Sequence, residues 1–153
     1  MGARGPENDH DLDFMVKPED AEHALESLGA AGLRTERPPE DWLFKAYDGD
    51  VMVDLIFRPA SGPVDDAMLD RAELLEVSAT RMRVLSLDDV LVTKLLALNE
   101  THLDYKGVLG LARAVREQID WDAVRERTDE SPYARAFFSL VEELGVLGRS
   151  SIG

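Results

Sequence analysis

The chain has 153 residues, of which 44% are hydrophobic and 31% are charged, a composition typical of one folded domain or of a compact fold with a helical extension. It contains no cysteine, which excludes disulfides, thiolate metal sites and thiol nucleophiles, and no apolar run of the roughly 20 residues that a bilayer span needs, which predicts no membrane partner. The 17 basic and 31 acidic residues give a net charge of −14, which attracts cations and disfavours sequence-independent binding of DNA. The polar start of the chain is unlike a signal peptide, so we expect a cytoplasmic location.

The first predicted elements are a strand and a helix. Acidic and apolar residues alternate along residues 10–16, and this is the period of a β-strand. Pro18 then opens a predicted helix to about residue 30, because proline suits the first helical position. Glu19 and Asp20 follow it, and acidic side chains suit the positive end of the helix dipole.

A hairpin is predicted next, with strands at residues 42–47 and 51–57. Asp48-Gly49-Asp50 stands between the two strands. Glycine accepts a positive φ at little cost, so this sequence suits a tight turn. The sequence therefore predicts an antiparallel pair of strands here.

The rest of the chain is predicted to be mainly helical. A short helix at 64–75 and a strand at 81–85 come before Ser86, which begins the Ser-x-x-Asp pattern of a helix N-terminus. The further predicted helices lie at 87–98, 105–118, 121–127 and 132–144. We therefore predict an α/β core at residues 1–85, a helical C-terminal part at 86–148 and a disordered tail at 149–153.

Three aspartates are the first candidates for chemistry. Asp11 and Asp13 point to the same side of the first predicted strand. Asp54 interrupts an otherwise apolar strand, where burying a charge costs free energy unless the charge has a partner. If these strands are neighbours, the carboxylates converge on one face, and two charges about 4 Å apart repel by roughly 4 kcal/mol at an effective dielectric of about 20. Such a cluster requires a cation or a shared proton, and oxygen-only ligands would select Mg²⁺ or Mn²⁺. The alternative is that Asp54 lies at a sheet edge and pairs with an arginine such as Arg58.

Several segments together carry a resemblance to a known family. They are residues 9–16, 18–21, 42–46, 53–57 and 84–98. With these segments the chain resembles, from about residue 9 to 147, the small stand-alone nucleotidyltransferases of the polymerase-beta-like superfamily. Relatives in that superfamily include bacterial toxin-type and antibiotic-modifying enzymes. The resemblance implies an α+β fold, with a mixed sheet, helices on one side of it and a helical C-terminal part.

The resemblance also implies a reaction and the residues that perform it. In that family, the acids that match Asp11, Asp13 and Asp54 bind two Mg²⁺ ions and are catalytic, and the third also helps to deprotonate the acceptor hydroxyl. Two metal ions can stabilise the attacking and leaving oxygens while a nucleotide is transferred. The implied activity is transfer of a nucleoside monophosphate from an NTP to a hydroxyl of a small molecule, a tRNA or a protein.

The sequence departs from the family pattern at its start. Family members usually carry a Gly-Ser or Gly-Gly pair, on a helix before the first acids, that holds the triphosphate. Here only Gly2 and Gly5 precede the first acids in that region, and they are the candidates for a remnant of this loop. We expect this departure to affect nucleotide binding more than the fold.

Three further residues are candidates for substrate binding. Lys94 falls on the apolar stripe of its predicted helix, so it either extends to water or reaches a phosphate or an acid in the cleft. Asp104 precedes a helix and either caps it or orients Lys94 through an ion pair. Lys45, across the predicted hairpin from Asp54, either balances the acids or lies on the surface.

Two functions of different classes are compatible with these patterns. The first is a Mg²⁺-dependent nucleotidyltransferase. The second is a catalytically inactive nucleotidyltransferase-like interaction protein, such as one partner of a toxin-antitoxin pair. The departure at the start of the chain and the charge of −14 favour the second, because both weaken the retention of a triphosphate.

Overall fold

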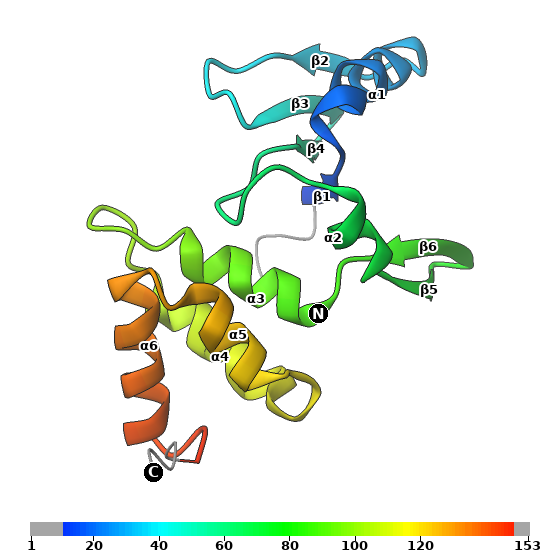
Figure 1. Cartoon of the computed structure of the whole chain (residues 1–153). Coiled ribbons are helices and arrows are strands. Elements are labelled where there is room, and N and C mark those ends of the chain that lie inside the picture. Colours follow the sequence, from blue (N-terminus) through cyan, green and yellow to red (C-terminus); the bar gives the residue numbers. More distant parts are fainter. Residues whose placement is uncertain (1–10, 149–153) are drawn as a thin grey trace, which may run out of the picture. The chain divides into compact units, whose positions relative to one another are not determined.

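The computed structural model describes residues 11–148, and it divides into two compact units, one ending at Leu69 and the other beginning at Asp70 (Figure 1). The predictions for Gly2, Gly5 and the tail at 149–153 lie outside the described residues. Among the helices within 11–148, none combines the length and the apolar character that crossing a membrane requires. Each unit is described by itself below.

The first unit contains a four-stranded sheet in the order β1-β4-β3-β2. Its strands are β1 (Asp11–Met15), β2 (Arg34–Glu36), β3 (Leu43–Asp48) and β4 (Val51–Ile56). The pairing of β1 with β4 is parallel, and the other two pairings are antiparallel, so the sheet is mixed. This architecture confirms the predicted α+β fold class with a mixed sheet. The short strand β2 was not predicted, because its polar, exposed residues lack the alternation that marks a half-buried strand.

Helix α1 (Pro18–Ala30) covers one face of this sheet and contacts β2, β3 and β4 (Figure 1). Pro18 opens the helix as predicted, and Leu25 is fully buried on its inner side. Leu25 packs in one cluster with Ala46 of β3 and with Val53 and Leu55 of β4. Because side chains alternate along a strand, the residues between these core positions point to the opposite face.

The turn between β3 and β4 confirms the predicted hairpin. The two strands are antiparallel, and Asp48 pairs with Val51 across the turn. Gly49 has a φ of +57°, a conformation that glycine adopts without steric cost. The tight turn fixes the register of the pair and places Lys45 directly opposite Asp54.

The second unit is built mainly on helices. They are α3 (Leu87–Leu96), α4 (Tyr105–Val115), the short 3-10 helix η1 (Arg116–Gln118), α5 (Trp121–Thr128) and α6 (Pro132–Glu143). Phe137 and Phe138 of α6 are buried and meet edge to face, with ring centroids 5.9 Å apart. They pack with Leu91 and Leu95 of α3 in one hydrophobic cluster. The predicted helical C-terminal part is therefore present, and its last helices begin at the predicted residues.

The helix predicted at 64–75 is wrong in its second half. The structure has a short helix α2 (Asp66–Asp70), followed by a separate hairpin of β5 (Glu73–Val77) and β6 (Thr80–Val84). The turn of this hairpin is made by Ser78 and Ala79, which have φ values of 50° and 63°. Neither residue type signals such a turn, and the glutamates and leucines before it are good helix formers. The hairpin belongs to the second unit, which begins at Asp70, whereas residues up to 85 were predicted to belong to the α/β core.

Candidate functional site

The predicted acidic residues Asp11, Asp13 and Asp54 lie on the face of the sheet opposite α1. In the parallel pairing of β1 with β4, Asp13 is the direct partner of Asp54, and Asp11 is the partner of Met52. Neighbouring strands are about 4.8 Å apart, so these positions are adjacent. We call the side of the sheet that bears Asp11, Asp13, Asp54 and Lys45 the carboxylate face. Two separate segments of the chain therefore bring acidic residues to the same face, as the alternation of each strand requires.

Lys45 forms an ion pair with Asp54. Its Nζ donates a hydrogen bond to Asp54 Oδ1 at 2.9 Å, and the side chains are 25% and 18% exposed, respectively. The hydrogen bond to Asp54 raises the pKa of Lys45 above its usual value, so the amine is an ammonium at neutral pH. Of the two interpretations of Lys45, the structure therefore favours the one in which it balances an acid.

The alternative interpretation of Asp54 is wrong. Asp54 lies on β4, which pairs on one side with β1 and on the other with β3, so it is not at an edge of the sheet. Its basic partner is Lys45, across the hairpin. Arg58 instead donates to the backbone carbonyl and the side chain of Asp41. Strand pairing, and not proximity in the sequence, decides which cation reaches this carboxylate.

The row of charges continues from β4 to the far edge of the sheet. Lys45 is opposite Asp54 on one side and opposite Glu36 of β2 on the other. Glu36 Oε2 accepts a hydrogen bond of 3.0 Å from the hydroxyl of Tyr47, whose ring lies 4.1 Å from the guanidinium carbon of Arg34. The ammonium of Lys45 therefore lies in a row between two carboxylate-bearing positions.

The carboxylate face has the donor chemistry of a site for hard cations. Its aspartates offer oxygen ligands only, which suit Mg²⁺ or Mn²⁺. Within residues 11–148, no group of three or more histidine, aspartate or glutamate side chains is gathered closely enough to hold a metal ion. The strand register brings the positions of the acids together. The side chains are not arranged as in a metal centre, because Asp54 forms an ion pair with Lys45.

Lys94 and Asp104 belong to the second unit. Lys94 lies in the last turn of α3 and is exposed. Asp104 caps α4, where its Oδ1 accepts a hydrogen bond of 2.9 Å from the backbone N–H of Gly107. The capping interpretation of Asp104 is confirmed. No ion pair between Asp104 and Lys94 is found in the described part of the chain.

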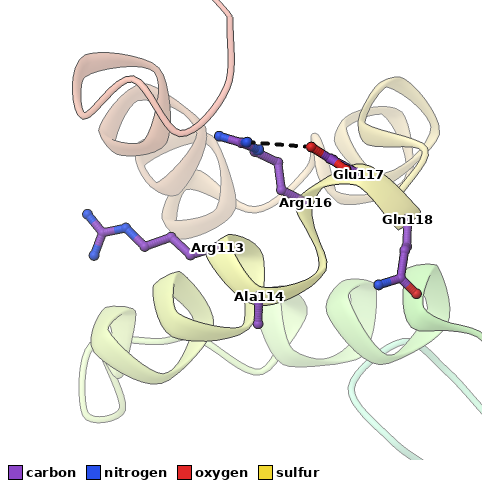
Figure 2. Close-up of a pocket in the computed structure, with 5 residues that line it drawn as sticks. All are labelled: Arg113, Ala114, Arg116, Glu117 and Gln118. Carbon is purple, nitrogen blue, oxygen red and sulfur yellow. Dashed lines mark ion pairs between the residues drawn. The ribbon is translucent and has the colours of Figure 1, made fainter.

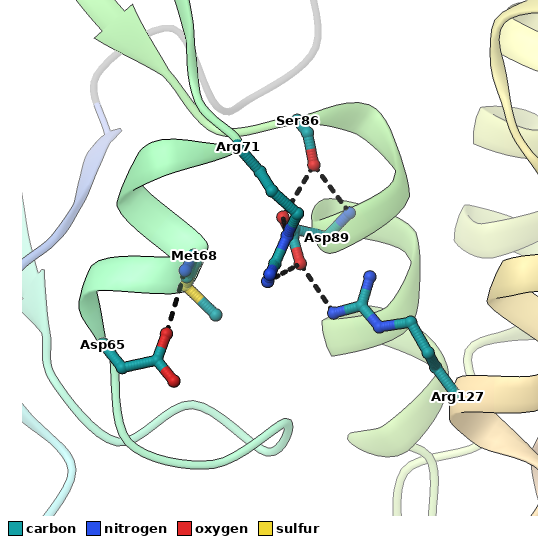
Figure 3. Close-up of polar contacts among 6 residues, drawn as sticks. All are labelled: Asp65, Met68, Arg71, Ser86, Asp89 and Arg127. Atoms are coloured by element: carbon teal, nitrogen blue, oxygen red, sulfur yellow. Dashed lines mark hydrogen bonds and ion pairs between the residues drawn. The ribbon is translucent and has the colours of Figure 1, made fainter.

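A second charged site, centred on Asp89, was not predicted beyond its capping pattern (Figure 3). Asp89 is buried on α3, and Ser86 caps the helix by accepting from the Asp89 backbone N–H and also donates to Asp89 Oδ2 at 2.7 Å. Arg71 donates to both carboxylate oxygens, each at 2.8 Å, and Arg127 donates to Oδ1 at 2.6 Å. The Ser-x-x-Asp pattern could indicate the cap. It could not indicate the two arginines, because they lie 18 and 38 residues away from Asp89 in the sequence.

The electrostatics of Asp89 are those of a structural ion-pair network. Burial by itself raises the pKa of this carboxyl, but the hydrogen bonds from Arg71, Arg127 and Ser86 outweigh burial and lower the pKa to about 2. The carboxylate is therefore ionised throughout the neutral range. Because donors surround both oxygens, this site holds elements of the second unit together and leaves little room for a ligand.

A small surface pocket lies at the junction of α4 and η1 in the second unit (Figure 2). Its volume is about 280 Å³, and it is lined by Arg113, Ala114, Arg116, Glu117 and Gln118. Arg116 and Glu117 are 3.7 Å apart and partly neutralise each other. None of the predicted site residues lines this pocket.

The chain matches a family described as uncharacterised nucleotidyltransferase over residues 9–142, and it belongs to that family. Among solved structures it is similar to the antibiotic-resistance factor ANT(2'')-Ia, with a TM-score of 0.51 and 13% sequence identity. That similarity covers 89% of this chain and 76% of the other, and it supports the nucleotidyltransferase-type fold. No curated protein matches the chain. The family resemblance predicted from the sequence is thereby confirmed.

Proposed function

We propose that this protein transfers a nucleoside monophosphate from an NTP to a hydroxyl acceptor, with Mg²⁺ or Mn²⁺ bound by Asp11, Asp13 and Asp54. The observation that carries the proposal is the register of β1 with β4, which sets Asp13 directly opposite Asp54, with Asp11 on the same face. Family membership supports nucleotidyl transfer in general. An NTP substrate is abundant in the cytoplasm, which is where we expect the protein to act.

The aspartates of the carboxylate face would have different roles in the reaction. Asp11 and Asp13 would hold the cations, and Asp54 would both bind a cation and accept the proton of the acceptor hydroxyl. The acceptor oxygen then forms a bond to the α-phosphorus as the bond to pyrophosphate breaks, and pyrophosphate leaves. Bound divalent cations would supply stabilisation of the negative charge on the attacking and leaving oxygens.

Several residues are proposed to bind the substrate. Lys45 contributes an ammonium on the carboxylate face, and Lys94 contributes an exposed one in the second unit. Asp104 stays a substrate-binding candidate in addition to its capping role. Gly2 and Gly5, the candidates for contact with the triphosphate, lie outside the described residues. An ammonium is a common partner of phosphate oxygens, which supports the two lysines.

The acceptor is proposed to be a hydroxyl on a small molecule, a tRNA or a protein. The similar solved structure is that of an antibiotic-resistance factor, and this makes a small molecule that carries hydroxyls the first acceptor to test. A sequence-independent DNA substrate is disfavoured by the net charge of −14.

The test is titration calorimetry with MnCl₂ and then with each NTP in the presence of Mn²⁺. We expect the wild type to bind Mn²⁺ and at least one NTP. Asp54→Asn should lose Mn²⁺ binding while its circular dichroism spectrum stays that of the wild type. Asp50→Asn is the matched control, because it removes the same charge from the exposed turn of the same hairpin and should bind like the wild type. A wild type that binds neither Mn²⁺ nor any NTP would contradict the proposal.

A second candidate function is that of a catalytically inactive interaction protein with a nucleotidyltransferase fold, such as a partner in a toxin-antitoxin pair. The observation that favours it is the ion pair of Lys45 with Asp54, which neutralises one of the three acids. The same titrations separate the two candidates. In an interaction protein Asp54→Asn would alter stability alone, because neither the wild type nor the variant would bind Mn²⁺.

A further inference from the structure

We propose that Lys45 is a positioning residue that holds Asp54 before a divalent cation binds and transfers its ammonium to Glu36 when the cation arrives. The proposal rests on the proposed function, because it concerns the same carboxylate face. It adds a role for two residues, Lys45 and Glu36, in setting the affinity for the cation.

The register of the sheet places Lys45 between its two carboxylate partners. Lys45 is the direct cross-strand partner of Asp54 on β4 and of Glu36 on β2. Residues directly opposite in a sheet point to the same face, so all three side chains are on the carboxylate face. The ammonium thus has an acidic neighbour on either side of its own strand.

The observed contacts show which partner Lys45 takes in this structure. Its Nζ is 2.9 Å from Asp54 Oδ1, and it lies 3.6 Å from the sulfur of Met52. Glu36 is exposed and uses Oε2 to accept from the Tyr47 hydroxyl at 3.0 Å. An ionised carboxylate has about four acceptor positions on its two oxygens, so Glu36 has capacity for the ammonium as well.

A cation bound by Asp13 and Asp54 would change this balance. A divalent ion and an ammonium on the same carboxylate repel each other, because like charges then lie close together at a partly buried position. The lysine side chain has a flexible four-carbon stem and moves at low cost. Glu36 then keeps the displaced ammonium paired, which lowers the free energy that cation binding must supply.

This coupling predicts a pattern of Mn²⁺ affinities that a double-mutant cycle can measure. Lys45→Met removes the competitor and should tighten Mn²⁺ binding by about five-fold, the factor that corresponds to a partly exposed ion pair of ~1 kcal/mol. Glu36→Gln removes the second partner and should weaken binding about two- to three-fold in the wild type. In the Lys45→Met background the same Glu36→Gln change should have no effect, because Glu36 acts through Lys45.

Controls keep the cycle interpretable. Glu40→Gln removes a carboxylate from an exposed position of the same unit and should leave Mn²⁺ affinity unchanged. Lys45→Gln should tighten Mn²⁺ binding as Lys45→Met does, and it replaces Lys45→Met in the cycle if that variant fails to fold. In a Mg²⁺ titration of the wild type followed by NMR, the Cε signal of Lys45 should shift. This signal is assigned as the one that is missing from the spectrum of Lys45→Met.

The outcomes separate this inference from the proposed function. If the wild type binds no Mn²⁺, both the proposed function and the inference fail. If the wild type binds Mn²⁺ but Glu36→Gln weakens binding equally in both backgrounds, the effect of Glu36 is only its charge at a distance, and the inference fails alone. It also fails alone if the lysine substitutions leave Mn²⁺ affinity unchanged or weaken it.

Discussion

Asp54 in the first unit and Asp89 in the second are both aspartates within largely apolar segments, yet their surroundings differ. The side chain of Asp89 is fully buried and accepts from Arg71, Arg127 and Ser86. The side chain of Asp54 is 18% exposed and accepts from Lys45. The comparison contrasts a buried carboxylate that is fixed by several donors with a partly exposed one that has an ion pair with one flexible lysine.

The chemistry of the partners explains the difference. A guanidinium is planar and rigid, and Arg71 contacts both oxygens of Asp89 in the bidentate geometry that carboxylates favour. An ammonium on a flexible stem is a point charge that moves readily. Asp89 is therefore fixed by its donors, whereas Asp54 is held by a group that can leave.

The largest expected effect is on the stability of the second unit. Asp89→Asn removes the negative charge with which both Arg71 and Arg127 form ion pairs. The free energy of unfolding should fall by about 3 kcal/mol, which is at the low end for a buried ion pair because both arginines reach solvent. Urea denaturation followed by circular dichroism measures the loss. Asp122→Asn, an exposed aspartate in the first turn of α5, is the control and should cost a few tenths of a kcal/mol. Equal losses in the two variants would show that the network is not structural.

The next effect concerns pH. The folded pKa of Asp89 is about 2, below its ordinary value of 3.8, so the carboxylate contributes stability that is present above pH 4 and is lost as the pH falls through 2. The gap in unfolding free energy between the wild type and Asp89→Asn should narrow by about 2 kcal/mol between pH 5 and pH 2. Urea titrations at both pH values measure it, and a constant gap would contradict the low pKa.

The hydroxyl of Ser86 should have a smaller but separable effect. Ser86 caps α3, and Ser131 caps α6, and each accepts from a backbone N–H at 3.2 Å. Ser86 also donates to Asp89, so Ser86→Ala should cost about 1.5 to 2 kcal/mol, whereas Ser131→Ala should cost only the cap, about 1 kcal/mol. Urea denaturation of both variants checks the difference. If the two costs are the same, the bond from Ser86 to the buried carboxylate adds nothing.

Local patterns in the sequence predicted the parts of the fold that depend on local physics. The alternation at residues 10–16 and the Asp48-Gly49-Asp50 turn predicted β1 and the β3–β4 hairpin, because each pattern acts over a few neighbouring residues. The strand predicted at 81–85 corresponds to β6, but its partner β5 was missed, because Ser78 and Ala79 adopt left-handed conformations that their residue types rarely show.

The partners of the two carboxylates were only partly predictable, for a physical reason. A carboxylate in an apolar strand requires a cation or a hydrogen-bond donor, but which one it finds depends on strand register and helix packing. Arg58 is four residues from Asp54, yet Lys45 on the neighbouring strand holds it. Arg71 and Arg127 meet at Asp89 only once the second unit has folded. The sequence thus indicated that Asp54 needs a partner and offered both Arg58 and Lys45, and the strand register selects Lys45.

The smallest expected effect completes the comparison of the two aspartates. Asp54→Asn breaks the ion pair with Lys45, but because both groups reach solvent, the free energy of unfolding should fall by less than about 1 kcal/mol. The amide can still accept a hydrogen bond from the ammonium, which limits the loss further. Urea denaturation measures it beside Asp89→Asn. A loss as large as that of Asp89→Asn would mean that the Lys45 pair is structural and that Asp54 is not free to exchange its partner for a cation.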